Sequence, residues 1–301
     1  MNAFSILIDT NADLPEGYIE EHDLSVIPVP FNLDGTQHSE GNFQKITAKE
    51  FYDALRNGGV AGTALINPES YVDVFKSYAE KKEPLLLLTL SSGLSGTYQN
   101  SVIALDDVRG DYPDCEIRIV DCSTAAGGSG LVTVLAVKKR GEGVPLDEAA
   151  DWLEEKKQSC LSLFTVNDLM YLYRGGRLSK LSAIAGSIIG VKPLLNVAPD
   201  GTLKLKDKVR GRKGAIKELV GQMMRSLNPG QSLDTVLISH TDCLEDAEAL
   251  AEIVRSSVEV RELHILMMGP VIGAHVGPGT LALFFEADMT RSEYDAKFYK
   301  D

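Results

Sequence analysis

The sequence predicts an α/β protein, with two α/β domains whose sheets are mainly parallel. Three observations lead to this fold class. Segments with strand-like and helix-like patterns alternate along most of the chain, as in parallel sheets covered by helices. The segment LLLLTL at 85–90 is almost wholly apolar, as expected for a strand that is buried on both faces. The chain has 301 residues, of which 44% are hydrophobic, which is enough to form two cores.

The first 160 residues contain the clearest helix and strand signals. Thr47 and Glu50 form a capping-box pattern, which predicts that a helix begins directly after Thr47. Asn67 followed by Pro68 predicts the start of a second helix, because Asn is a favourable cap and Pro is tolerated in the first turn. In chain order we expect strands at 4–10, 85–90 and 116–121, and helices at 47–59, 67–81, 96–108 and 128–141.

The pattern changes near residue 160, and we therefore predict two domains, residues 1–160 and 161–301. A helix that contains Trp152 precedes this point, and a strand follows it. Asp200 and Gly201 have the composition of a hairpin turn. The segments expected here are strands at 161–166, 235–240 and 262–268, a hairpin at 192–209, a small-residue helix that ends near 190, and a helix at 245–257.

Composition and charge exclude several function classes. A formal net charge of −13 at pH 7 argues against a general nucleic-acid-binding protein. The apolar runs are far shorter than the roughly 20 residues of a membrane span, and the N-terminus lacks a signal-peptide pattern, so we expect a cytoplasmic protein. The four cysteines are scattered, which predicts reduced thiols and no metal site. The strand-end residues Asp9, Asp13 and Asp121 are predicted to cap helices.

The turn SSGLSG at 91–96 follows the buried strand and precedes a helix. Ligands of open parallel sheets bind at this edge, beyond the carboxyl ends of the strands. Ser92 and Ser95 place hydroxyls beside the unpaired N–H groups of a helix N-terminus, which favours an anion. The alternative is that these hydroxyls only cap the helix.

This turn is one of several motifs that occur in order along the chain: ILIDTNADLP, GTALINPESY, LTLSSGLSGTYQNS, VDCSTAAGGSG, YLYRGGRLS, VKPLLNVAPDGTLKLKDKVRGRKGAI and GPVIGAHVGPGTLALFF. Over essentially the whole chain, the series resembles the DegV family of bacterial fatty-acid-binding proteins. The resemblance implies two α/β domains that enclose one long-chain fatty acid, such as palmitate or oleate, between them.

The resemblance also implies the biochemical role. Several members of the family are acyl-carrying subunits of bacterial fatty acid kinase, in phospholipid metabolism, and present the bound carboxylate to a separate catalytic subunit for phosphorylation to acyl phosphate. We therefore expect a carrier and not an enzyme, with no cofactor, and with transient contact to a membrane surface as a further possibility.

A carboxylate site is implied at specific positions. Thr63 and Ser95 match the hydroxyls that the family places at the carboxylate, with Ser92 and the backbone of Leu94 as secondary candidates. His275, which lies among glycines in GAHVGPG, matches a histidine near the ligand head and has a ring N–H to donate. Taken alone, a histidine of this kind is more often a structural residue with satisfied hydrogen bonds.

Arg174, Arg177 and Arg210 are implied contacts for the kinase subunit or for its phosphate. Where the strand is regular, period-two spacing would place a whole stripe of basic side chains on one face. A solvated face or a protected sheet edge is the alternative interpretation. The stripe consists of Lys204, Lys206, Lys208, Arg210 and Arg212.

Two motifs depart from the family pattern. The T-S-Q motif reads Thr63–Ala64–Leu65 here, and Cys122 and Ala126 stand where the family has serines. These changes make the surroundings of the head group more apolar. The preferred chain length and saturation therefore stay open, as does service to a kinase.

Two other functions compete with the carrier, and a monomer is the default oligomeric state. A serine hydrolase of acyl esters would use Ser92 or Ser95 with His240 or His275 as base, although the chain has no G-x-S-x-G motif. A nucleotide-binding enzyme lacks support, because neither G-x-x-x-x-G-K-[ST] nor a G-x-G-x-x-G after the first strand is present.

Overall fold

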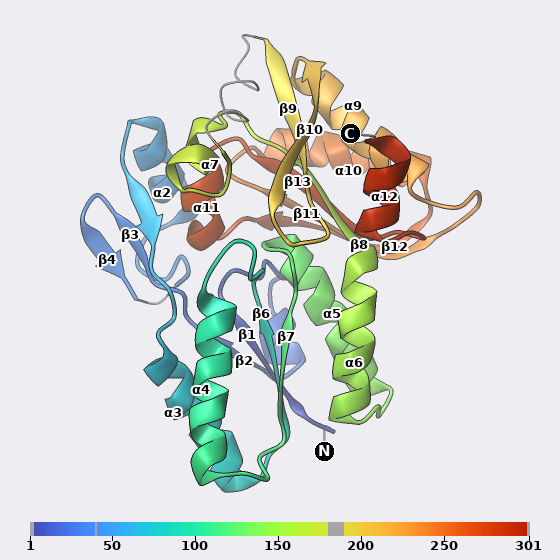
Figure 1. Cartoon of the computed structure of the whole chain (residues 1–301). Coiled ribbons are helices and arrows are strands. Elements are labelled where there is room, and N and C mark those ends of the chain that lie inside the picture. The colour runs from blue at the N-terminus through green and yellow to red at the C-terminus, as the bar shows by residue number, and fades with distance from the viewer. Residues whose placement is uncertain (1–2, 40, 180–189, 300–301) are drawn as a thin grey trace.

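The computed structural model describes residues 3–39, 41–179 and 190–299, which form three β-sheets and the helices around them (Figure 1). The predicted α/β class is confirmed. A four-stranded and a six-stranded sheet occupy opposite halves of the molecule, and a small three-stranded sheet lies at one side. The predicted small-residue helix lies almost entirely outside the described residues. None of the described helices is long and apolar enough to cross a bilayer.

The four-stranded sheet is parallel throughout, as predicted, in the order β2-β1-β6-β7. Every residue of its central strand β6 is buried. Leu85 and Leu87 pack toward α3 and α4, whereas Leu86 and Leu88 pack toward α5 and α6, which explains the unbroken apolar run. The elements are β1 (Ser5–Asp9), β2 (Leu24–Ile27), β6 (Leu85–Thr89), β7 (Ile117–Asp121), α3 (Pro68–Lys81), α4 (Thr97–Asp111), α5 (Gly127–Gly141) and α6 (Leu146–Lys156).

The six-stranded sheet differs from the predicted parallel arrangement. Its order is β10-β9-β8-β13-β11-β12, and only β11 and β12 are parallel neighbours. The hairpin β9–β10 is antiparallel because a short turn joins its strands, and β13 runs antiparallel to both of its neighbours, β8 and β11. The elements are β8 (Cys160–Thr165), β9 (Val191–Val197), β10 (Leu203–Arg210), β11 (Leu233–His240), β12 (Val260–Met267), β13 (Leu281–Glu286), α9 (Arg212–Arg225), α10 (Leu244–Ser257) and α12 (Arg291–Phe298).

Helix α5 lies between the two large sheets and contacts strands of both. Its first turn is GGSG, and a side chain at these glycines would collide with neighbours. A Cβ on Gly127 would lie 2.7 Å from the Phe284 ring, and one on Gly130 would lie 2.1 Å from the Asp13 carbonyl oxygen. The glycines therefore allow the two halves to pack closely around α5. The predicted boundary at 160/161 falls at the start of β8 and stays a prediction.

The small sheet and one helix form a unit that we call the α2 subdomain, residues 31–63. It consists of β3 (Phe31–Leu33), β4 (Thr36–His38), α2 (Ala48–Arg56) and β5 (Ala61–Thr63), with strand order β4-β3-β5. The predicted capping box is present, since Thr47 and Glu50 bond each other's backbone N–H groups. The subdomain packs on α11 (Pro270–Val276). The remaining elements are α1 (Tyr18–Glu21), η1 (Lys157–Ser159) and α7 (Met170–Arg174).

The basic stripe predicted for the hairpin is interrupted. Leu205 pairs with Leu195 but Asp207 pairs with Leu194, so a bulge at Lys206 reverses the alternation of side chains. Lys204 therefore lies on one face, and Lys208 and Arg210 lie on the other. The two remaining members have carboxylate partners: Lys206 pairs with Asp295 at 2.9 Å, and Arg212, at the start of α9, with Asp246 at 2.8 Å. The prediction of a single five-residue stripe was wrong.

Candidate functional site

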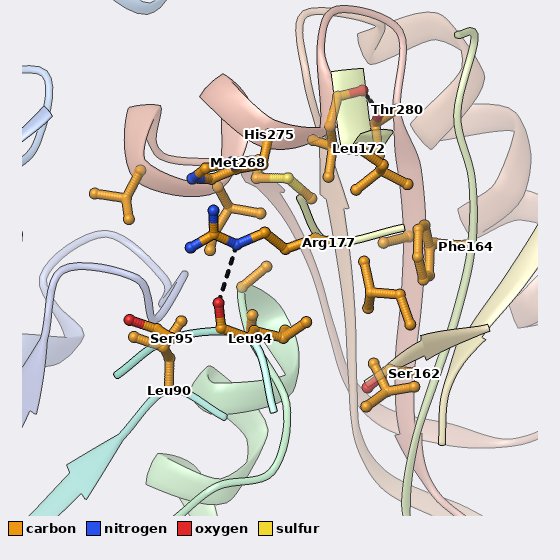
Figure 2. Close-up of a pocket in the computed structure, with 18 of the residues that line it drawn as sticks. Leu90, Leu94, Ser95, Ser162, Phe164, Leu172, Arg177, Met268, His275 and Thr280 are labelled. Carbon is orange, nitrogen blue, oxygen red and sulfur yellow. Dashed lines mark hydrogen bonds between the residues drawn. The ribbon is translucent and has the colours of Figure 1, made fainter. Parts of the chain in front are cut away.

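A largely apolar cavity lies between the two large sheets (Figure 2). The space between its walls, part of it open to solvent, is ≈ 770 Å³. Both halves of the chain contribute: Leu90 and Leu94 come from the loop after β6, Phe164 from β8, and Val271 and Ile272 from α11. The polar side chains among the lining residues are Thr63, Ser95, Ser162, Arg177, His275 and Thr280.

Four of these side chains gather at one end of the cavity, which we call the polar end: Thr63, Ser95, Arg177 and His275. Thr63, the last residue of β5, and His275 of α11 share a hydrogen bond of 2.9 Å between Oγ1 and Nε2. Burial, and then the nearby Arg177 charge, lower the pKa of His275 to about 4. The imidazole is therefore neutral at pH 7, with one N–H to donate.

Arg177 connects the turn after β6 to the polar end. Its Nε donates to the Leu94 carbonyl oxygen at 3.0 Å (Figure 2). Its Nη1 donates to the Gly175 carbonyl oxygen. Half-burial lowers the pKa of Arg177. Gly175 allows this turn to lie close to His275, because a Cβ on Gly175 would lie 2.5 Å from His275 Nδ1. The sequence analysis placed Arg177 at a partner surface, and its place in the cavity wall was missed, although the adjacent glycines signalled a close contact.

Ser95 and Ser92 have different surroundings. Ser95 lines the cavity, and its hydroxyl lies 2.9 Å from Thr97 Oγ1 at the start of α4. Ser92 is exposed, lies outside the cavity lining and donates to Asp121 Oδ2 at 2.6 Å. Leu94 lines the cavity, but both of its backbone polar groups have partners: its N–H donates to the Ser91 carbonyl oxygen at 3.0 Å, and its carbonyl oxygen accepts from Arg177. Of the two serines, only Ser95 is therefore placed to contact a ligand in this cavity.

The other two predicted arginines lie outside the cavity lining. Arg174 is exposed, with its guanidinium 5.0 Å from the Tyr171 ring centroid. Arg210 is exposed at the end of β10. The arginines at 174 and 177 thus occupy the outside and the inside of one turn.

The opposite end of the cavity, which we call the sheet end, is built from β8 and β13. Ser162 and Phe164 of β8 pair with Phe284 and Ala282 of β13, and all four line the cavity. The Ser162 hydroxyl already has a partner, Thr124 Oγ1, at 2.9 Å. This end therefore offers hydrocarbon surface and no free charge.

Asp9 and Asp121 hold loops and do not cap helices, contrary to the prediction, whereas Asp13 accepts from the N–H of Gly269, the residue that precedes α11. Residues Gly96 and Ala126 precede α4 and α5, and neither helix has a side-chain cap. Asp9 accepts hydrogen bonds from the backbone N–H groups of Asn11 and Leu90, and Asp121 from those of Ser92 and Ser123. No cluster of potential metal ligands occurs in the part of the chain that the structure describes.

Comparison with known proteins places this geometry in a family. The profile described as "Uncharacterised protein, DegV family" matches residues 3–288. A DegV domain-containing protein of Clostridium perfringens is 38% identical over 289 residues, covering 96% of this chain and 99% of its own length.

Solved structures share the fold. The DegV lipid-binding protein of Thermotoga maritima has 30% sequence identity and a TM-score of 0.83, covering 96% of this chain and 100% of its own. A stearic acid-binding protein of Eubacterium ventriosum has 26% identity and a TM-score of 0.84, with 97% and 99% coverage. The chain belongs to the DegV family.

Proposed function

We propose that this protein binds one long-chain fatty acid in the cavity between the two large sheets, with the carboxylate at the polar end. One observation carries the proposal: an apolar cavity has the polar side chains Thr63, Ser95, Arg177 and His275 gathered at a single end. A molecule with one charged head and a long hydrocarbon tail matches that distribution. The names of the lipid-binding and stearic acid-binding relatives support the same ligand class.

The tail supplies most of the binding energy in this arrangement. At about 0.8 kcal/mol per buried methylene, a sixteen-carbon chain gains roughly 11 kcal/mol. Each charge-assisted hydrogen bond to the head contributes on the order of 1.5–3 kcal/mol. Contacts at the polar end therefore determine chiefly which way round the ligand lies.

Three groups at the polar end suit a carboxylate. The Ser95 hydroxyl can donate, and the hydrogen-bonded Thr63–His275 pair has one further donor, which is the Thr63 hydroxyl or the His275 ring N–H according to the tautomer. Arg177 adds a positive charge to the cavity wall. Its guanidinium is held in place there by hydrogen bonds to the Leu94 and Gly175 carbonyl oxygens. A bound carboxylate would gain hydrogen bonds and a favourable potential at this end.

The finer part of the proposal is that the protein is a carrier that presents the carboxylate to a separate fatty acid kinase subunit. Arg174 and Arg210 are exposed, so they are available to an approaching anionic or acidic partner. The chemistry would then belong to the kinase subunit, and this chain would need no cofactor.

The competing serine hydrolase has no geometric support among the described residues. His275 Nε2 pairs with Thr63, and His240 Nδ1 accepts from the backbone N–H of Cys243. Ser95 pairs with Thr97 and Ser92 with Asp121. A nucleophilic serine needs a histidine as its hydrogen-bonded base, and neither serine has one here.

Native mass spectrometry of the freshly purified protein, followed by denaturation and analysis of released molecules, tests the proposal. We expect one long-chain fatty acid per chain. A protein that arrives empty and also fails to bind added palmitate and oleate would contradict it. Labelling by a fluorophosphonate probe would instead favour the hydrolase.

A further inference from the structure

The peptide unit that joins Met268 to Gly269, directly before α11, is hydrogen-bonded at both of its polar atoms by distant side chains. Tyr52 Oη donates to the Met268 carbonyl oxygen at 2.6 Å. The Gly269 N–H donates to Asp13 Oδ1 at 3.1 Å. Both bonds are buried. Tyr52 belongs to the α2 subdomain, and Asp13 belongs to the loop after β1. A peptide unit held at both ends cannot rotate without losing one of these bonds.

Tyr52 also touches the middle of α11. A Cβ on Gly273 would lie 2.4 Å from Tyr52 Oη and 3.0 Å from its ring, so only glycine lets the helix lie this close. The Tyr52 side chain is completely buried. Tyr52 therefore holds the peptide directly before α11 and contacts the helix again at Gly273, two residues before His275.

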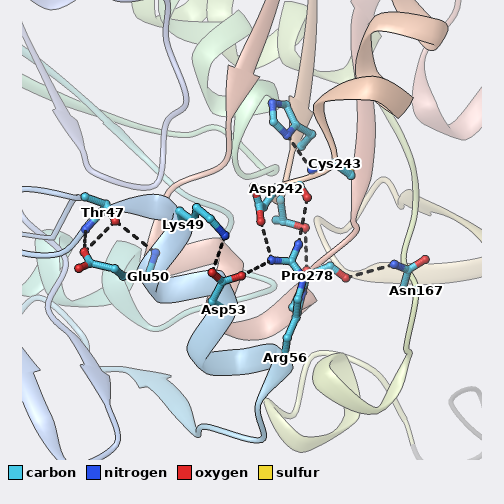
Figure 3. Close-up of polar contacts among 12 residues, drawn as sticks. Thr47, Lys49, Glu50, Asp53, Arg56, Asn167, Asp242, Cys243 and Pro278 are labelled. Atoms are coloured by element: carbon cyan, nitrogen blue, oxygen red, sulfur yellow. Dashed lines mark hydrogen bonds and ion pairs between the residues drawn. The ribbon is translucent and has the colours of Figure 1, made fainter.

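Helix α2 is itself fastened to the C-terminal half of the chain. Tyr171 Oη donates to the Leu55 carbonyl oxygen at 3.1 Å. Arg56 donates to the Asp242 carboxylate at 2.5 Å and to the Asp242 carbonyl oxygen at 3.0 Å (Figure 3). Tyr52 thus projects from a helix that has limited freedom to shift relative to α11.

Thr63 belongs to the same subdomain as Tyr52, and His275 belongs to α11. The contact between Tyr52 and α11 therefore determines how the subdomain that carries Thr63 meets the helix that carries His275. Neither Tyr52 nor Asp13 lines the cavity, so neither contacts a ligand there.

We propose that Tyr52 and Asp13 are positioning residues for the carboxylate site: by holding the Met268–Gly269 peptide, they place α11 so that His275 meets Thr63. Because the site is a carboxylate site only if the proposed function is right, this inference rests on that proposal. A site held by buried hydrogen bonds of this kind recognises its ligand with little rearrangement.

The test is the substitution Tyr52→Phe, which removes one hydroxyl and keeps the ring. Tyr71→Phe is the matched control, because Tyr71 is also completely buried, lies in α3, and its hydroxyl has no hydrogen-bond partner among the residues that the structure describes. The first measurement is an NMR titration of His275 in lipid-free protein. We expect its midpoint, about 4 in the parent, to rise toward 6.5 in Tyr52→Phe as α11 loosens and water reaches the ring, and to stay unchanged in Tyr71→Phe.

The second measurement compares the affinities for palmitate and for its methyl ester. We expect the preference for the free acid to fall about fivefold in Tyr52→Phe, because the head contacts lose alignment while the tail contacts persist. Asp13→Ala, which removes the acceptor for the Gly269 N–H, is expected to change both measurements in the same direction, and it replaces Tyr52→Phe if that variant does not fold.

Unchanged titration of His275 and an unchanged acid preference in a folded variant would overturn the inference. The proposed function fails separately, if the parent protein binds neither palmitate nor its ester. In that case the His275 titration, which needs no ligand, still decides whether Tyr52 and Asp13 position α11.

Discussion

The two ends of the cavity are built in different ways. The polar end combines side chains from segments that are far apart in the chain: Thr63 from β5, Ser95 from the loop before α4, Arg177 after α7 and His275 from α11. The sheet end comes from two paired neighbouring strands, β8 and β13. The polar end therefore depends on how several segments are held together, whereas the sheet end depends on local packing. In the proposed function, contacts at the polar end determine the orientation of the ligand, and packing at the sheet end contributes to the binding energy.

The largest expected effect is on the free energy of unfolding, through Asp13, which holds the peptide before α11. Burial raises the pKa of Asp13 from 3.8 to about 7. Between these values the folded protein holds a proton on Asp13 that the unfolded chain has released, so the contribution of Asp13 to stability is fully present below about pH 4 and is lost as the pH rises through 7. The full difference corresponds to about 4 kcal/mol. Asp13→Asn should remove this contribution, which denaturant unfolding at pH 4.5 and 7.5 measures.

Asp53→Asn is the control for this pH experiment. Asp53 is an exposed carboxylate on α2 whose pKa is lowered, first by its hydrogen bond with Lys49 (Figure 3). Asp53 titrates below the range from pH 4.5 to 7.5, so the Asp53→Asn variant should show the same change in the free energy of unfolding with pH as the parent. If Asp13→Asn also kept the parent slope, Asp13 would be ionised at both pH values and our assignment of its pKa would fail.

The sheet end should respond to a change in volume. Ala282→Phe places a ring beside Phe164, in the space assigned to the tail. Loss of about three buried methylenes costs roughly 2.4 kcal/mol, or about fiftyfold in palmitate affinity. Competition binding with acids of different length checks this, and decanoate should be retained as the internal control. Equal loss of short and long acids would show that the tail does not reach this end.

The two serines of the turn after β6 provide a matched pair at the polar end. Ser95→Ala should weaken palmitate binding by roughly tenfold or somewhat more, the loss of one charge-assisted hydrogen bond of at least about 1.5 kcal/mol, and should reduce phosphorylation by a kinase subunit further, because the carboxylate loses alignment. Ser92→Ala should change neither, since Ser92 lies outside the cavity lining. A lipid-free but folded Ser95→Ala protein would show that the polar end supplies the main binding energy.

The smallest effect on lipid binding is expected at the surface. Charge reversal at the two exposed arginines, Arg174→Glu with Arg210→Glu, should leave palmitate affinity within about twofold, because neither side chain lines the cavity. The same variant should reduce phosphorylation by a kinase subunit strongly, and high salt should reduce phosphorylation of the parent protein. Normal turnover of the variant would remove these arginines from the partner surface.

Local sequence patterns determined much of the fold. The capping box at Thr47 and the cap at Asn67 predicted the starts of α2 and α3, because hydrogen bonds within one helical turn need no distant partner. The apolar run at 85–90 predicted β6, and Asp200 with Gly201 predicted the hairpin. Strand direction in the six-stranded sheet was not predictable in this way, because pairing of β8, β13 and β11 joins segments far apart in the chain.

The candidate site divides along the same line. The motif resemblance nominated Thr63, Ser95, Leu94 and His275, and the structure places all of them in the wall of one cavity. It separates Ser92 from them, and it moves Arg177 from an expected surface into that wall. Sequence spacing does not show which side chains of a turn point into a cavity and which point into solvent, because this depends on the distant segments that the turn packs against.

By itself, the sequence determined the α/β class, most helix and strand positions, and the residue types that can recognise a carboxylate. Only the tertiary structure decided which of those residues share a cavity, and that Tyr52 and Asp13 hold one peptide from opposite sides. The physical reason is range: caps, turns and periodicity act within a few residues, whereas the Thr63–His275 contact and the Met268–Gly269 bonds join segments more than 200 residues apart.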